Sequence, residues 1–577
     1  MKHSTKILSV MAAIGLSLSF FAGCGGMTGN QGEAVDNTKT QLYVYSYNGG
    51  YGNDWLLEVK ERFEEEYKDY VSSDGKVGVQ IMPSIVDKVI GSNMIDTFST
   101  NSNEIFFTES VFYYDWVRDG GDNSLMLDIT DAVTAPLDDL GESRSIYDKM
   151  TPELQEFLNA GTDTEKKLYA VPYRTDIEGI IYDMDLFNDS SLYYAKGGCP
   201  SEFSEFTQEN NENAATGTFS DYMYTDFAGE RSAGPDGKYG TDDDGLPATY
   251  EEFFNLCDYM AYELSITPFT WGGKASIRST YLGWLYQQLL ADYEGLDGYT
   301  SYFTYEGTSD HLVDTISDDG TMTFLPETDI SKDGSVISRS AGRYYATKFF
   351  ETLIKNSDYY DGKCFNGTQT HMLAQMDYLE SKYEREQIAF LVDGIWWENE
   401  ANQTFEEMAQ TEESDSRLNR SFGLLPMPKA TMDQIGEPTT WVDNLASLCF
   451  VRSNISEEKI DLAKKFIRFC FTDESNKNFN LLTGCARAMG GYTLSDEELG
   501  QLSSFGQSVY RMISSAPIVA PYGKNDVYKL NVANRTIQFG GDLVCSESSI
   551  YDEFKYGTQT AETIFRNSMD GLKDYFN

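Results

Sequence analysis

The stretch Gln41–Tyr67, QLYVYSYNGGYGNDWLLEVKERFEEEY, joins a strand pattern to a helix pattern through a glycine-containing loop. Its first seven residues are rich in β-branched and aromatic side chains, which favours a strand. The apolar residues that follow recur every fourth position and predict a helix with one apolar face: Trp55, Val59, Phe63 and Tyr67. A strand, a glycine loop and a helix in this order open an α/β layer, in which ligands bind beyond the carboxyl ends of the strands.

The composition describes a large, acidic and folded protein. The chain has 577 residues, enough for two compact cores. It carries 44 Lys and Arg against 92 Asp and Glu, a net charge of −48, so nucleic acid is a poor partner. Aromatic residues make up 14%, far more than a disordered acidic chain carries. With three histidines, His-dependent catalysis and multi-His metal sites are disfavoured, while paired-carboxylate chemistry stays open.

The N-terminus has the pattern of an export signal. Lys2 and Lys6 precede an apolar run, residues 7–21, that is short for a membrane span. The run ends in Phe21-Ala22-Gly23-Cys24, which resembles a bacterial lipobox. We therefore expect residues 1–23 to be removed, Cys24 to be lipidated, and residues 24–40 to be a flexible tether at the extracellular face of the cell membrane. An ordinary secretory signal is the alternative.

Several further segments resemble one family in their order along the chain: LYAVPYRTDIEGIIYDMDLF (168–187), LPATYEEFFNLCDYM (246–260), QIAFLVDGIWWENEA (387–401), FGLLPMP (422–428), DLAKKFIRFCFTDESNKNFNLLTG (461–484) and YGTQTAETIF (556–565). That family is the extracellular solute-binding proteins of ABC importers, the sugar-binding family 1 in particular. The chain departs from the family pattern in two ways. It has Tyr182-Asp183 where the family often has Tyr-Asn, and it is longer than is usual for the family.

The resemblance implies an α/β, two-lobed periplasmic-binding-protein-like fold (type II, maltodextrin-binding-protein-like) with hinge crossings and a central cleft. Its lobe I would take residues 41–172 and 395–471, and its lobe II residues 173–394 and 472–577, with insertions near 188–248 and 294–342. The crossings would fall near Pro172-Tyr173, Gly394–Trp396 and Phe471–Asp473. The resemblance also implies a monomeric binding protein without enzymatic activity, which captures an oligosaccharide and delivers it to ABC permease subunits in the membrane.

A sugar offers C–H faces to aromatic rings and hydroxyl groups to short polar side chains. Residues of these kinds at expected loop ends are the candidate ligand contacts: Tyr47, Asn48, Glu109, Tyr173, Arg174, Asp176, Trp271, Trp396, Trp397, Glu398, Trp441, Asp443 and Asn444. For each tryptophan among them the alternative is a place in the core. Arg174 is either a ligand donor or a partner of Asp176. Trp55, Trp116 and Trp284 lie on helix-like periods and are expected in the core.

The loop DGKYGTDDDG (236–245) combines acidic residues with glycines that allow it to fold back. Such a loop can bind Ca²⁺, which prefers six to eight oxygen ligands. The candidate ligands are Asp236, Asp242, Asp244 and Glu252, and a solvated turn is the alternative. The bound Ca²⁺ would be structural, and no cofactor is required. Cys257, Cys449 and Cys470 have apolar neighbours and are expected to fill core.

Three rival functions remain at this point. The same fold can bind a peptide, a polyamine or another small solute, and a cationic one would be favoured by Glu398, Asp443 and Glu109. A surface glycoside hydrolase would use paired carboxylates. An adhesion or scaffold protein would bind no small solute.

Overall fold

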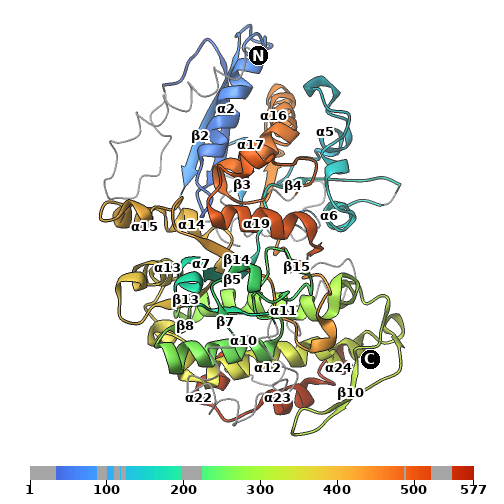
Figure 1. Ribbon diagram of the computed structural model, residues 1–577. Helices are drawn as coiled ribbons and strands as arrows, with labels where there is room; N and C mark the ends of the chain where they lie inside the picture. Colours follow the sequence, from blue (N-terminus) through green and yellow to red (C-terminus); the bar gives the residue numbers. More distant parts are fainter. Residues whose placement is uncertain are drawn as a thin grey trace.

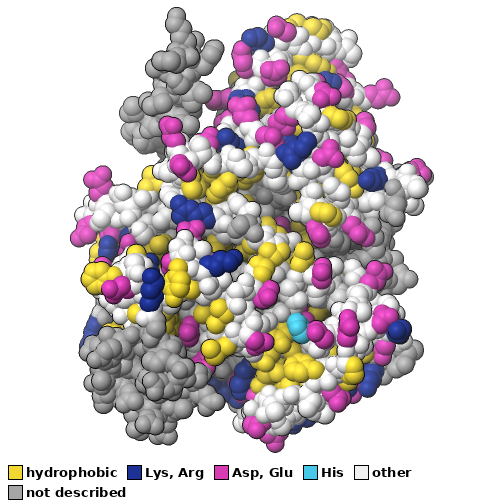
Figure 2. Space-filling view, turned by 45° about the vertical axis from the view of Figure 1, so that its right-hand side comes forward, with side chains coloured by type: hydrophobic (Ala, Val, Ile, Leu, Met, Phe, Trp, Pro, Cys, Tyr) yellow, Lys and Arg dark blue, Asp and Glu magenta, His cyan; other side chains and the backbone are white. Residues whose placement is uncertain are grey.

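The computed structural model describes residues 34–86, 101–109, 113, 117, 125–162, 164–196, 224–445, 447–486, 489–520 and 549–576. These form two lobes stacked one above the other, each built on its own sheet (Figure 1). Among the described residues no helix is long and apolar enough to span a membrane. The expected signal peptide, Cys24 and most of the tether lie outside them, as does Trp116. Asp and Glu side chains are spread over both lobes (Figure 2).

Lobe I contains a five-stranded sheet in the order β2-β1-β3-β16-β4. Its strands are β1 (Thr40–Tyr47), β2 (Val79–Val86), β3 (Ile105–Thr108), β4 (Ala170–Pro172) and β16 (Leu448–Val451). The first strand is parallel to both of its neighbours, and β16 is antiparallel to β3 and β4. The predicted strand at the start of the fold is confirmed. The carboxyl ends of β1 and β3 meet at one edge, which is where the polar residues that follow them lie.

Among the described residues, this lobe contains the helices α2 (Asp54–Glu66), α5 (Thr130–Thr134), α6 (Pro152–Leu158), α16 (Glu457–Cys470) and α17 (Asp473–Thr483). The predicted apolar face of α2 is buried at Trp55, Val59 and Phe63. The Phe63 ring meets the rings of Phe466 and Phe469 edge-on at 5.0 and 5.4 Å, so α2 and α16 pack together. Aromatic packing thus joins the two ends of lobe I, which are about 400 residues apart in the chain.

Lobe II contains a four-stranded mixed sheet in the order β14-β5-β13-β8. Its strands are β5 (Glu178–Asp183), β8 (Thr267–Thr270), β13 (Ile388–Gly394) and β14 (Phe422–Leu425). The helices around it are α7 (Met184–Asp189), α10 (Tyr250–Asp258), α11 (Ala275–Thr304), α12 (Ala341–Lys355), α13 (His371–Glu380), α14 (Trp397–Glu400), α15 (Asn402–Ala409), α19 (Ser504–Ser515), α22 (Ile550–Tyr556), α23 (Ala561–Ser568) and α24 (Lys573–Phe576). The Thr249 side chain accepts from the Glu252 N–H and so caps the start of α10.

Small two-stranded sheets lie in lobe II and at its border with lobe I. They are β6 (Tyr193–Tyr194) with β7 (Tyr224–Thr225), β9 (Thr308–Ser309) with β12 (Thr328–Asp329), β10 (Val313–Ile316) with β11 (Met322–Phe324), and β15 (Trp441–Val442) with β17 (Ile518–Val519). The expected insertion at 294–342 begins inside α11, which continues beyond a kink at Gly295. Gly295 has a φ of 70°, a conformation that glycine adopts without strain.

The chain crosses between the sheets at 173–177, 426–447 and 484–503 within the described residues. The first crossing is where the sequence placed it, next to Pro172-Tyr173. The other two predictions were wrong. After Gly394 the chain forms α14 and α15 and returns to the same sheet as β14, so residues 422–425 belong to lobe II. After Asp473 it continues as α17, which packs on α2 in lobe I.

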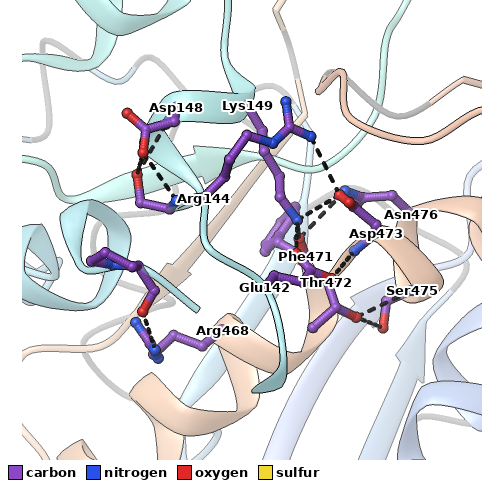
Figure 3. A network of polar contacts seen from close by, with 12 residues as sticks. Glu142, Arg144, Asp148, Lys149, Arg468, Phe471, Thr472, Asp473, Ser475 and Asn476 are labelled. Atoms are coloured by element: carbon purple, nitrogen blue, oxygen red, sulfur yellow. Dashed lines mark hydrogen bonds and ion pairs between the residues drawn. The ribbon is translucent and has the colours of Figure 1, made fainter. Parts of the chain in front are cut away.

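A buried lysine holds α17 in lobe I (Figure 3). The Lys149 side chain is fully buried, and its ammonium lies 2.5 Å from Glu142 Oε2 and 2.8 Å from Asp473 Oδ1. It also donates to the Phe471 carbonyl oxygen at 2.9 Å. These contacts fasten the 142–149 segment to the turn between α16 and α17. They explain why the chain stays in lobe I beyond residue 471.

Candidate functional site

Arg174 lies in the first crossing and connects both lobes. Its guanidinium is 2.8 Å from Asp176 Oδ1 and 2.6 Å from Glu109 Oε2, and it donates to the Gly49 carbonyl oxygen at 3.1 Å. It also lies over the Tyr51 ring, 3.8 Å from the ring centroid. With 3% of the residue exposed, its donors serve these internal partners. Of its two predicted roles, the structure therefore shows the partner of Asp176, and Glu109 joins that pair.

The second crossing is hydrogen-bonded to the first. Asp443 Oδ1 accepts from the Asp176 N–H at 3.1 Å, and the Asn444 amide donates to Glu178 Oε1 at 3.0 Å. Asp443 is 3% exposed, and Asn444 is partly buried. Burial, reinforced by the Asp176 charge, raises the pKa of Asp443 to about 8. Burial likewise raises the pKa of Glu178 well above its usual range, with Asp176 adding to the rise. The buried acids Asp176, Glu178 and Asp443 thus connect the first two crossings, and this connection is called the hinge below.

Trp396 is the candidate tryptophan that lies between the lobes and stays partly exposed. On the lobe I side its ring lies 5.9 Å from the Tyr51 ring, and a Cβ on Gly50 would come within 2.6 Å of its Cδ1. On the lobe II side a Cβ on Gly394 would come within 2.3 Å of the indole. Glycines at both positions therefore leave room for the indole close to the two backbones.

The other three candidate tryptophans are packed inside the protein, contrary to the prediction that they line a cleft. Trp271, Trp397 and Trp441 are all fully buried. The Trp271 indole donates to the Cys364 carbonyl oxygen at 3.0 Å. Trp397 is enclosed by other rings: Tyr378, Phe405, Phe422 and Phe505. Trp441 belongs to β15, next to the central strand of lobe II.

Two more candidates are interior residues. Tyr173 is 2% exposed, and its ring stacks on that of Trp55 at 6.0 Å. Glu398 is 5% exposed, and its Oε2 accepts from the Ser503 hydroxyl at 2.6 Å. Burial raises the pKa of Glu398 to about 7. Glu398 therefore connects α14 to the start of α19 in the interior of the protein. Trp55 is in the core, as predicted, whereas Trp284 is half-buried.

At the end of β1, Tyr47 and Asn48 remain partly exposed. The Asn48 side chain accepts from the Asn53 side-chain amide at 2.5 Å, a hydrogen bond within the loop that follows β1. The Tyr47 hydroxyl has a raised pKa because of burial, and the charges of Glu109 and Glu400 add to the rise. Since Glu109 follows β3 and Glu400 ends α14, Tyr47 lies near acids from both lobes.

Sequence reasoning missed a polar group on lobe II that belongs to this site. His371 Nε2 lies 3.6 Å from Glu400 Oε2, and the rings of His371 and Tyr281 stack at 5.8 Å. The buried Gln375 amide donates to Glu400 Oε2 at 2.8 Å and to Asp393 Oδ2 at 3.0 Å. His371 is not among the candidate residues named from the sequence. The signal that could have placed it is Thr370, an N-cap residue that begins α13 there.

The partly exposed residues at this meeting of the lobes are called the junction cluster below: Tyr47, Glu109, Tyr281, His371, Trp396 and Glu400. Burial raises the pKa of Glu109, although the Arg174 charge opposes it, and the charge of Glu400 contributes to the rise. Burial lowers the pKa of His371, but Glu400, Asp393 and Glu109 together outweigh it, so the net shift is upward. The cluster therefore combines aromatic rings with acids from both lobes.

The residues of the acidic loop at 236–245 bond to their own loop and to α19. Asp236 accepts from the Lys238 N–H at 2.7 Å, Asp244 accepts from the Gly240 N–H at 2.8 Å, and Asp242 pairs with Arg511 at 3.3 Å. Glu252 accepts from the Ala248 N–H at 2.6 Å. Over the described part of the chain no group of three His, Cys, Asp or Glu residues is placed to hold a metal ion. The predicted convergence of carboxylates is therefore not seen.

Two cavities lie within single lobes, away from the junction cluster. One of about 600 Å³ lies between α2 and the start of α17 in lobe I, and one of about 270 Å³ lies between α10 and α12 in lobe II. Cys257, Cys364, Cys449, Cys470 and Cys485 are buried, as expected for Cys257, Cys449 and Cys470.

No family model and no curated relative matches the chain by sequence. Solved structures do match. A "Chitin oligosaccharide binding protein" is 15% identical, with a TM-score of 0.51 over 93% of this chain and 99% of that one. A structure titled "SBP RafE in complex with raffinose" is 12% identical, with a TM-score of 0.51 over 93% and 100%. A protein from a study of xylan utilization by Caldanaerobius polysaccharolyticus is 12% identical, with a TM-score of 0.50 over 92% and 99%. The chain has the two-lobed type II fold of periplasmic solute-binding proteins.

Proposed function

We propose that this protein is the extracellular, lipid-anchored solute-binding component of an ABC importer and that it captures an oligosaccharide by closing its lobes. The observation that carries the proposal is the junction cluster, in which Tyr47, Tyr281 and Trp396 lie beside carboxylates from both lobes. Rings stack on the C–H faces of sugars, and carboxylates accept from sugar hydroxyl groups.

The hinge supports the same function. The lobes are joined by crossings at 173–177, 426–447 and 484–503, and the first two are tied by hydrogen bonds of Asp176 and Glu178. Hinge closure needs only a few residues within such connections to change their backbone angles, while each sheet keeps its own packing. Two of the similar solved structures carry names of sugar binders, which favours a sugar over other solutes. Export directed by residues 1–23, lipid anchoring at Cys24 and delivery of the solute to a permease complete the proposal.

The test is calorimetric titration of the purified chain with a panel of neutral and charged oligosaccharides, with a peptide and a polyamine set beside it. We expect an oligosaccharide to bind, and Trp396→Ala to weaken its binding at least tenfold. Phe227→Ala is the matched control, because that ring is 68% exposed on lobe II. Binding of peptides or polyamines but no glycan would refute the proposal, as would hydrolysis of a bound glycan that stops when Glu109 or Glu400 is changed to Gln.

A further inference from the structure

We infer that the cavity between α10 and α12 in lobe II is a second carbohydrate site, which takes a single neutral sugar ring. The cavity lies within one lobe, so binding there needs no closure of the lobes and goes beyond the proposed function. Three features carry the inference: aromatic rings in the wall of the cavity, a buried amide without a hydrogen-bond partner, and a set of donors and acceptors that hydroxyl groups match better than ions do.

Facing sides of two helices build the wall of this cavity. α10 and α12 lie side by side in lobe II (Figure 1). On α10 the cavity is lined by Glu251, Asn255 and Asp258, and on α12 by Lys348 and Thr352. Residues three and four positions apart share one face of a helix, so these side chains point to the space between the two helices.

The size of the cavity suits one ring. A cavity of roughly 150 Å³ lined by apolar residues accepts a benzene molecule. The cavity between α10 and α12 has about 270 Å³ and is partly polar. It therefore has room for one pyranose with its hydroxyl groups, but it does not enclose a longer chain.

Aromatic rings form the apolar part of the wall. The ring of Phe254 lies 4.9 Å from that of Phe349 and stacks on that of Tyr359 at 5.9 Å, with 18° between the two planes. All three residues line the cavity, and Phe254 is half-buried. Aromatic rings of this kind pack against the C–H face of a pyranose.

Asn255 brings a buried amide to this wall. The residue is 7% exposed, and its side-chain amide has no hydrogen-bond partner in the part of the chain that the structure describes. The hydroxyl group of Thr352, by contrast, donates to the Lys348 carbonyl oxygen at 3.0 Å. Buried polar side chains are normally hydrogen-bonded. An amide that lines a cavity without a partner therefore points to a ligand that supplies one.

Asp258 lies beside Asn255 on the same helix face. Side chains three residues apart on a helix have Cβ atoms about 5–6 Å from each other, so two hydroxyl groups of one sugar ring can reach both. The Tyr359 hydroxyl donates to Asp258 Oδ1 at 2.6 Å. The second carboxylate oxygen is left to accept from a ligand, and the Tyr359 oxygen can accept as well.

The hydrogen-bonding groups of the wall favour hydroxyl groups over ions. An anion would meet the carboxylates of Glu251 and Asp258, while the Lys348 ammonium is already paired with Glu351 and Glu562 at 2.9 Å each. An ammonium could donate to the carboxylates, but it has no acceptor for the N–H groups of the Asn255 amide. A hydroxyl group both donates and accepts, so a neutral sugar matches the amide and the carboxylates together.

The backbone next to the cavity has an uncommon form. α10 continues without a break into a π-helix, Tyr259–Leu264, directly after Asp258. The π-helix ends at Ser265, which has a φ of 57°, a left-handed conformation that is uncommon for residues other than glycine. π-helices are rare and occur frequently at functional sites. Its position beside the cavity agrees with a binding site there.

The experiment titrates the full chain with glucose, galactose, mannose, xylose and N-acetylglucosamine by saturation-transfer NMR, with indole, acetate and trimethylammonium beside them. We expect at least one sugar to bind with an affinity that salt leaves unchanged, and Asn255→Leu to weaken it at least tenfold. Asn402→Leu on α15 is the matched control, because that amide already donates to Glu406 at 2.8 Å. The binding should persist in Trp396→Ala, which alters the junction cluster.

Thermal unfolding of Asn255→Leu adds a measurement without ligand. The substitution removes no hydrogen bond within the described protein, so the unfolding midpoint should not fall below that of the wild type. A lower midpoint would show that the amide is structural and would overturn the inference.

Four binding results would also overturn it. They are sugar binding that Asn255→Leu leaves unchanged, binding of indole, acetate or trimethylammonium without any sugar, binding of none of these probes, and sugar binding that Trp396→Ala alone abolishes. The last result would place the sugar at the junction cluster, so the second site would fail while the proposed function stands.

Discussion

The substitution Lys149→Met removes the cation that holds α17 against the 142–149 segment. Its ammonium is fully buried and contacts Glu142, Asp473 and the Phe471 carbonyl oxygen at 2.5 to 2.9 Å. Methionine keeps most of the apolar stem but leaves two carboxylates and one carbonyl without this donor. The change therefore separates the electrostatic contribution of Lys149 from its packing.

The magnitude follows from the exposure of the partners that remain. Breaking a buried ion pair from one side costs about 3–5 kcal/mol. The side chains of Glu142 and Asp473 are 18% and 39% exposed, so water can solvate them in part and the loss should lie at the lower end, about 3 kcal/mol. Lys465→Met is the matched control, because Lys465 pairs with Asp461 on the solvent side of α16 and such pairs contribute little.

The assay is denaturant unfolding combined with native-state hydrogen exchange. Lys149→Met should lower the free energy of unfolding of lobe I and speed exchange of the α17 amides, while Lys465→Met should resemble the wild type in both. If the two variants lose equal stability, or if α17 exchanges as slowly as before, the Lys149 contacts do not hold this helix. The revised lobe boundary at residue 471 would then lose its physical explanation.

Three further predictions concern the tryptophans and the hinge. Trp397→Ala should destabilise lobe II by about 3–5 kcal/mol in denaturant unfolding, because a fully buried ring is removed, and a loss below about 1 kcal/mol would contradict its place in the core. Trp396→Ala should instead leave the unfolding midpoint within a few degrees of the wild type by thermal unfolding, and a larger loss would mean that the ring is structural. Asp443 keeps its proton in the folded protein up to about pH 8, whereas an aspartate in the unfolded chain loses it near pH 3.8, so the native state binds more protons between these values and stability falls as pH rises. Asp443→Asn should flatten that fall in unfolding measured from pH 4 to 8, and an unchanged slope would refute the raised pKa.

Local patterns predicted the elements well and the connections poorly. The strand at 40–47 and the helix at 54–66 follow from period and composition. The sheet to which β14 belongs depends on its pairing with β5, which lies about 240 residues earlier in the chain. Nothing in the sequence FGLL distinguishes one apolar sheet from another. The same limit applies to α17, whose lobe is set by Lys149 and Arg62 contacts from distant segments.

The site shows the same limit at the level of single side chains. Trp396 and Trp397 are adjacent and chemically identical, yet one lies between the lobes and the other is enclosed by rings, because consecutive residues at the start of α14 point in different directions. Sequence could name the pair but could not rank its members. His371 and Glu400 are 29 positions apart, and their contact exists only because α13 and α14 both pack at the end of the lobe II sheet. A pair of this kind has no local signature.

The hinge acids show how function and stability oppose each other at this junction. Apolar side chains of similar size would pack the crossings at 173–177 and 443–444 without the desolvation cost that raises the pKa of Glu178 and Asp443. Carboxylates there instead fix the register of one crossing against the other through directional hydrogen bonds. An apolar contact would hold many relative angles of the lobes nearly equally well, whereas hydrogen bonds favour few. The buried acids therefore give the hinge a defined geometry, which the proposed closure of the lobes on a solute would require.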